Sequence, residues 1–287
     1  MLKNYLSLIK FSHTIFALPF ALIGFTLAIS QKEYAFTWDK LLFVLLCMIF
    51  ARSAAMAFNR YIDRDVDSAN PRTAKIREIP NGRIKEESAL LFVIVNCILF
   101  MGATYFLNSL CFLLSPIALL IILGYSYTKR FTALCHIILG LGLSLSPIGA
   151  YLAVTAQFDI IPLLFSCIVL FWVSGFDIIY ALQDQNVDKQ LNLHSIPVLL
   201  GQKNALLFSR LMHFITATII LYIGINYFTN SIIFWTATCL FIGLLINQQR
   251  LVKPNDLSKI NLAFFTNNGI ASLIFGSLIV IELITNN

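Results

Sequence analysis

Long apolar segments repeat along almost the whole chain, and they constrain the fold more than any other feature. Hydropathy predicts about nine segments long enough to cross a bilayer, at 14–31, 41–61, 88–106, 110–128, 133–155, 160–181, 204–228, 231–249 and 261–284. Only 12% of the 287 residues are charged, against about 25% in soluble domains. The chain is therefore predicted to be an all-α polytopic membrane protein, with residues 1–287 forming one integral domain.

Lys and Arg are distributed unevenly among the predicted loops. They gather before the first segment and after every second one, including the long polar loops at about 62–87 and 182–203, whereas the opposite loops carry only Lys32 and Lys40. Positive residues accumulate on the cytoplasmic side of a membrane. The N-terminus and both long loops are thus predicted to be cytoplasmic. The formal charge of +6 then reflects topology, with the lipid bilayer as partner and no nucleic acid.

An acidic cluster, NRYIDRDVD over 59–67, follows the second apolar segment. On a continuous helix, Asn59, Asp63 and Asp67 would lie within an arc of about 80°, whereas Asp65 would point away. Carboxylates so close to hydrocarbon are costly and are seldom kept without a partner. We predict that Asn59, Asp63 and Asp67 act at a functional site and that Asp65 is a solvated acid paired with a neighbouring arginine.

A second acidic cluster, DIIYALQDQNVD over 177–188, follows the sixth apolar segment. Asp177, Asp184 and Asp188 would share a helix face within about 40°. Two such carboxylate faces placed opposite each other would repel without cations between them. Mg²⁺ suits this arrangement, because it takes oxygen ligands from one or two carboxylates and from substrate phosphates. The clusters are therefore predicted to hold Mg²⁺ and, through it, a lipid diphosphate.

These clusters resemble the two aspartate-rich motifs of the UbiA family of membrane-embedded aromatic prenyltransferases, NDxxDxxxD and a DxxxD commonly preceded by Asp-x-x-Tyr. The matching residues are Asn59, Asp63 and Asp67 in the first motif, and Asp177, Tyr180, Asp184 and Asp188 in the second. Arg60 stands where many members have the first Asp of the first motif. The runs at 13–19, 70–73, 77–82 and 125–130 are also similar to the family.

The resemblance implies a bundle of about nine transmembrane helices around a central cavity, capped by the two long cytoplasmic loops. It also implies Mg²⁺-dependent transfer of a polyprenyl chain from its diphosphate to an acceptor ring, in the inner (plasma) membrane of a bacterium. The residues expected to be catalytic are Asp63, Asp67, Asp177 and Asp184. The expected metal ligands are Asn59, Asp63 and Asp67 for one ion, and Asp177, Asp184 and Asp188 for another.

Basic and aromatic side chains near the clusters complete the expected site. A diphosphate leaving group needs cations beyond Mg²⁺. The candidates for binding it are Arg72, Arg77, Lys129, Arg130 and Lys189. Breaking the allylic C–O bond leaves a carbocation, which aromatic faces stabilise. Tyr125 and Tyr180, with Tyr127 nearby, are the candidates for that role.

Arg52 lies within the second apolar segment, seven residues before Asn59 and on the same helix face. An arginine about two turns inside a membrane needs an acid partner or a bound anion. We hypothesise that Arg52 meets the substrate, through either the diphosphate or a carboxylate of the acceptor. The alternative is a structural pair with Asp177.

The acceptor predicted from the resemblance is 4-hydroxybenzoate, on a route to ubiquinone, because the first motif and the 70–73 run look most like that branch. A naphthoate-type acceptor on a menaquinone route is the first alternative. An ion-coupled secondary transporter is the alternative from a different class, since transporters also carry intramembrane acids. The acids here cluster at one membrane face rather than at mid-membrane, which favours the enzyme.

Overall fold

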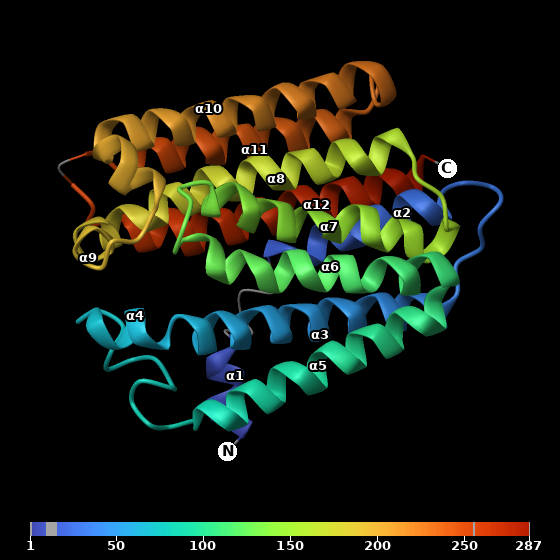
Figure 1. Cartoon of the computed structure of the whole chain (residues 1–287). Coiled ribbons are helices and arrows are strands. Elements are labelled where there is room, and N and C mark those ends of the chain that lie inside the picture. Colours follow the sequence, from blue (N-terminus) through green and yellow to red (C-terminus); the bar gives the residue numbers. More distant parts are fainter. Residues whose placement is uncertain (1, 10–15, 255, 287) are drawn as a thin grey trace.

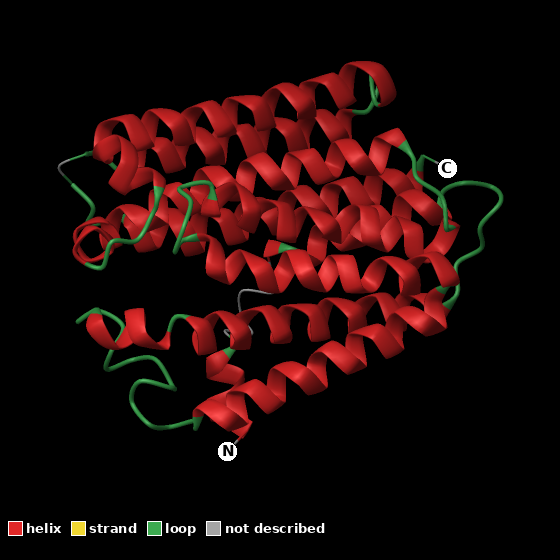
Figure 2. Ribbon diagram, viewed as in Figure 1, coloured by secondary structure: helices red, strands yellow, loops and turns green. Residues whose placement is uncertain are grey.

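The computed structural model describes residues 2–9, 16–254 and 256–286; His13, in the run at 13–19, lies outside these ranges. Figures 1 and 2 show that the described chain is built from helices joined by loops. The longer helices are α2 (Leu18–Ile29), α3 (Trp38–Ile62), α5 (Glu86–Leu107), α6 (Ser109–Thr128), α7 (Cys135–Thr155), α8 (Ile160–Ala181), α10 (Ile196–Tyr227), α11 (Ile232–Leu251) and α12 (Asn268–Thr285). The shorter ones are α1 (Leu2–Leu8), α4 (Arg64–Ala69), η2 (Leu182–Asp184), α9 (Gln185–Gln190) and η3 (Leu262–Asn267).

Within the described residues, 8 helices are long and apolar enough to cross a membrane. This confirms the all-α polytopic prediction. The predicted segment at 14–31 corresponds to α2, a shorter apolar helix of 12 residues. The predicted segment at 204–228 forms the later part of α10, which already begins at Ile196. Gly201 interrupts that helix with φ 74°, a left-handed conformation that glycine tolerates best.

The core is formed where α2 packs against α7, α8 and α12. The Phe20 ring lies 5.5 Å from Trp172 and 5.9 Å from Phe275, between centroids. The backbones of α2 and α7 approach most closely at Gly24, where an added methyl group would overlap the carbonyl oxygen of Pro147. Only glycine allows this approach without moving a helix.

Gly24→Ala is therefore expected to lower the free energy of unfolding by about 1–3 kcal/mol, because α2 and α7 must separate to admit the methyl group. Thermal unfolding of the purified protein in detergent measures the change. Gly102→Ala is the matched control: no atom lies within 4 Å of its added methyl group. That variant should be as stable as the wild type or slightly more stable, since alanine favours helix. Equal stability of both variants would show that the close approach contributes little.

Each acidic cluster lies where a long helix gives way to a short one. Backbone angles of φ −88° and ψ 11° at Asp63 separate α3 from α4. Likewise, α8 ends at Ala181 and passes through the 3₁₀ turn η2 into α9. The helix is therefore not continuous through Asp67, and the arc of about 80°, which assumed a continuous helix, does not describe this cluster. Figure 1 shows α4 and α9 at the same end of the bundle, with the C-terminus at the opposite end.

Candidate active site

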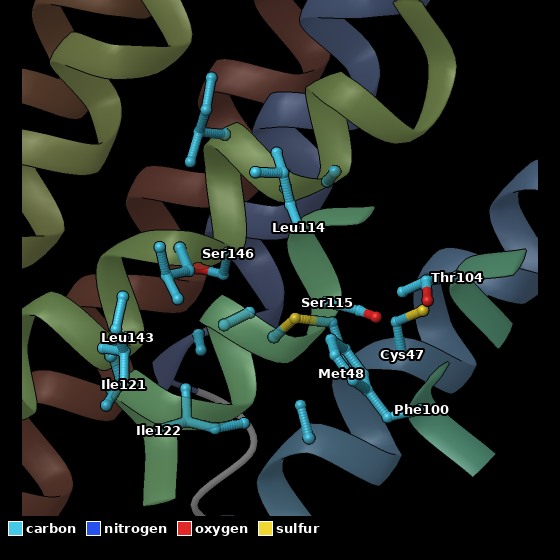
Figure 3. Close-up of a pocket in the computed structure, with 18 of the residues that line it drawn as sticks. Cys47, Met48, Phe100, Thr104, Leu114, Ser115, Ile121, Ile122, Leu143 and Ser146 are labelled. Atoms are coloured by element: carbon cyan, nitrogen blue, oxygen red, sulfur yellow. The ribbon is translucent and has the colours of Figure 1, made fainter. Parts of the chain in front are cut away.

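A cavity of about 390 Å³ lies among α3, α5, α6 and α7. Its walls are mostly apolar. Figure 3 shows side chains contributed by all four helices: Cys47 and Met48 from α3, Phe100 and Thr104 from α5, Leu114, Ser115, Ile121 and Ile122 from α6, and Leu143 and Ser146 from α7. The expected central cavity is thus lined mainly by the N-terminal half of the chain. Arg52 and Tyr125 line it; Arg52 is in the part of α3 that leads to the first acidic cluster, and Tyr125 is near the C-terminal end of α6.

Arg72, from the loop after the first cluster, binds Asp184 of the second. Its Nε and one terminal nitrogen lie 3.1 and 2.6 Å from the two carboxylate oxygens, and Asn70 Nδ2 donates to the same carboxylate at 2.8 Å. The Tyr180 hydroxyl lies 3.4 Å from Arg72. Burial alone would lower the pKa of Arg72, but the Asp184 carboxylate outweighs burial and raises it. The two motif regions therefore face each other, as the sequence predicted.

Lys129, directly after α6, connects to both clusters. Its Nζ lies 2.7 Å from Oδ1 of Asp188, a buried carboxylate. Burial disfavours the ammonium, but Asp188 reverses that effect and the pKa of Lys129 is raised; Asp184 and Asp63 contribute in the same direction. This lysine is therefore a partly buried cation among acids of both motifs.

In the first cluster, Asn59 and Arg60 form a chain of polar contacts. Asn59 Nδ2 donates to Asp63 at 2.8 Å, and Arg60 donates to Asn59 Oδ1 at 3.0 Å. The guanidinium nitrogens of Arg60 and Arg77 lie 4.0 and 3.7 Å from the Asp67 carboxylate. Burial raises the pKa of Asp63 to about 6, while burial and nearby Arg60 lower the pKa of Arg77 to about 10. Arg60, at the position of the missing motif acid, is thus a fixed cation beside Asp67.

Asp177 has a partner that the sequence did not indicate. Oδ2 of Asp177 lies 2.7 Å from Nδ1 of His136, near the start of α7. The alternative pair between Arg52 and Asp177 is therefore wrong. Arg52 instead lines the cavity, and its buried Nε has no hydrogen-bond partner within the described ranges.

Three of the remaining predicted residues, Asp65, Arg130 and Lys189, are exposed. Asp65 is a solvated acid, as expected, but its arginine partner is Arg130, which donates hydrogen bonds of 2.7 and 3.0 Å, and not an arginine that neighbours it in the sequence. Because Arg130 is engaged there, and Lys189 is exposed on α9, their part in binding diphosphate stays a prediction. Tyr180 packs against Phe264, with ring centroids 4.1 Å apart.

The ligand types fit Mg²⁺ held jointly with a phosphate. Across residues 2–9, 16–254 and 256–286, no three His, Cys, Asp or Glu side chains converge into a closed metal cage. Mg²⁺ does not need one, since it is usually bound by one or two carboxylates together with substrate phosphates. Asp67 Oδ2 is buried, lies 4.0 Å from the Arg60 guanidinium and has no hydrogen-bond partner among the described residues, so it can still accept a ligand contact.

Comparisons with known proteins agree with this geometry. Residues 17–269 match the UbiA prenyltransferase family. The 4-hydroxybenzoate octaprenyltransferase of Photobacterium profundum is 30% identical over 235 residues, 80% of this chain and 79% of that protein. The enzyme of that name from Tolumonas auensis is 32% identical over 242 residues, 84% of this chain and 83% of that protein.

Two solved structures share the fold. A UbiA homolog from Aeropyrum pernix superposes with a TM-score of 0.83 at 31% identity, covering 94% of this chain and 98% of that one. A UbiA homolog from Archaeoglobus fulgidus bound to DMAPP and Mg²⁺ gives a TM-score of 0.78 at 20% identity, covering 98% and 99%. The matched family spans most of the chain and includes both acidic clusters. The protein therefore belongs to the UbiA family and is a prenyltransferase.

Proposed function

We propose that this enzyme transfers a polyprenyl group from a polyprenyl diphosphate to 4-hydroxybenzoate, in a Mg²⁺-dependent step of quinone biosynthesis. The observation that carries the proposal is an apolar cavity with Arg52 on its wall, close to two facing acidic clusters; the buried Nε of Arg52 has no hydrogen-bond partner in the described part of the chain. Such a cavity suits a hydrocarbon chain, and the arginine suits an acceptor carboxylate. The names of the curated relatives and the DMAPP and Mg²⁺ bound by the Archaeoglobus homolog support the same assignment.

The acidic residues would form two groups of ligands, and each group would hold one Mg²⁺ ion. Asn59, Asp63 and Asp67 are the proposed ligands on the first motif, and Asp177, Asp184 and Asp188 those on the second. Bound Mg²⁺ supplies positive charge that stabilises the leaving diphosphate. Basic residues around the motifs would bind the phosphate oxygens directly: Arg72, Arg77, Lys129, Arg130 and Lys189.

The cavity walls would protect the carbocation that forms at the reactive end of the donor. Breaking the C–O bond of an allylic diphosphate yields a carbocation, which the ring carbon beside the acceptor's phenolic hydroxyl attacks. Apolar walls exclude water, which would otherwise capture the cation. Tyr125 and Tyr180 are the proposed aromatic stabilisers of this cation. Arg52 would fix the orientation of the acceptor, and no covalent enzyme intermediate is needed.

Product analysis tests this function. Membranes containing the protein receive a labelled polyprenyl diphosphate with either 4-hydroxybenzoate or a naphthoate-type acid, with Mg²⁺ or with EDTA. We expect labelled prenyl-4-hydroxybenzoate that disappears with EDTA. A product from the naphthoate alone would move the enzyme to a menaquinone route. Absence of any prenylated product with either acid, despite intact protein, would contradict the proposal.

A further inference from the structure

His136 connects its own helix, α7, to two others, α8 and α10, at the edge of the candidate site. It is near the start of α7, its side chain is 3% exposed, and its Nδ1 lies 2.7 Å from Asp177 on α8. Its Nε2 accepts a hydrogen bond of 3.3 Å from the backbone N–H of Ile196, at the start of α10. Because Nε2 accepts, the proton of the neutral ring is on Nδ1, and it is donated to the carboxylate.

The hydrogen bond from His136 restrains the Asp177 side chain but leaves part of it accessible. The Asp177 side chain remains 21% exposed, and His136 takes only Oδ2. Tyr180 lies one turn farther along the same face of α8 and contacts Arg72, which holds Asp184. The Asp177 carboxylate, which His136 restrains, therefore lies on the same polar helix face as Tyr180, close to Asp184 of the same motif.

We propose that His136 is a positioning residue that holds the Asp177 carboxylate in its working rotamer; the inference rests on the proposed function, in which Asp177 acts at the metal and diphosphate site. A free aspartate at this depth would sample other rotamers or turn toward other polar groups. A buried N–H donor fixed by a second hydrogen bond, to the α10 backbone, removes that freedom. Hydrogen-bond partners behind metal ligands typically contribute 10–100-fold to metal affinity or activity.

Two substitutions separate positioning from packing. His136→Leu removes the donor, whereas His136→Asn keeps an N–H near the position of Nδ1, directed toward Asp177. His194→Gln is the matched control, since His194 is exposed on the loop between α9 and α10. Each variant is purified in detergent, and three quantities are measured: kcat and KM for the donor, the Kd for Mn²⁺ with a non-hydrolysable prenyl thiodiphosphate, and the unfolding temperature.

We expect His136→Leu to lower kcat and weaken Mn²⁺ binding about 10–100-fold, with a smaller change in the donor KM. His136→Asn should recover most of both losses, and His194→Gln should match the wild type. In an Asp177→Asn background, His136→Leu should cause no further loss of Mn²⁺ affinity, because there is no carboxylate left to position.

A full additional loss in the Asp177→Asn background would overturn the proposal. So would equal losses in His136→Leu and His136→Asn that follow a lowered unfolding temperature, since packing alone predicts that result. Mn²⁺ binding does not depend on turnover. If the wild type transferred no prenyl group, the proposed function would fail, whereas the binding data would still decide the role of His136.

Discussion

Asp63→Asn and Asp184→Asn should each reduce prenyl transfer by at least about 100-fold while leaving the amount of protein in the membrane close to wild type. Asparagine matches aspartate in size but carries no charge. At Asp184 it would keep the contact with the Asn70 and Arg72 loop only in part, because the bidentate pair needs a carboxylate. At either position, loss of the negative charge removes a ligand that Mg²⁺ prefers.

The measurement is turnover of labelled donor in isolated membranes, normalised to protein detected by immunoblot. Asp65→Asn is the matched control from the same cluster. Its side chain is 61% exposed and pairs with Arg130 rather than facing the second motif. Because an exposed ion pair contributes little, that variant should retain near-normal turnover. Near-normal turnover in both Asp63→Asn and Asp184→Asn would defeat the two-motif metal site.

Arg52→Lys should raise the KM for 4-hydroxybenzoate about 10–100-fold and change the KM for the donor far less. The guanidinium lines the cavity, its Nε is buried without a hydrogen-bond partner in the described chain, and Asp177 is already engaged by His136. A carboxylate bound by two guanidinium N–H groups loses one of them when lysine replaces arginine. A hydrogen bond to a charged group contributes about 1.5–3 kcal/mol, which corresponds to this range.

An acceptor without the carboxylate provides the control for Arg52. With phenol in place of 4-hydroxybenzoate, wild type and Arg52→Lys should have similar KM values, because the group that Arg52 recognises is missing. Equal effects of the substitution on donor and acceptor would remove the acceptor assignment and place Arg52 nearer the diphosphate.

The bundle and the positions of its polar ends were predictable from local patterns. Runs of about twenty apolar residues identify membrane spans because the thickness of the bilayer fixes their length. The regular spacing of Asp63, Asp67, Asp184 and Asp188 also identified polar helix ends that proved to lie at the same end of the bundle. Each of these patterns is contained in a stretch of sequence about as long as one helix.

Long-range partners were not predictable in this way. His136 is 41 residues from Asp177, and Arg72 is 112 residues from Asp184, so no spacing rule connects them. The breaks at Asp63 and at η2 also escaped prediction, because polar residues that suit a helix surface also suit the short turns between helices. The position of the cavity also depends on tertiary packing. Aromatic side chains around α2 fill the other half of the bundle, so the cavity lies among α3, α5, α6 and α7.

A structure of the enzyme with Mn²⁺, a prenyl thiodiphosphate and 4-hydroxybenzoate, in which anomalous scattering locates the metal, would examine the site directly. One Mn²⁺ should lie at Asn59, Asp63 and Asp67 and another at Asp177, Asp184 and Asp188, and both should contact the diphosphate. The prenyl chain should enter the cavity among α3, α5, α6 and α7, and the acceptor carboxylate should meet Arg52. Metal bound away from both motifs, or a prenyl chain lying outside that cavity, would contradict the account.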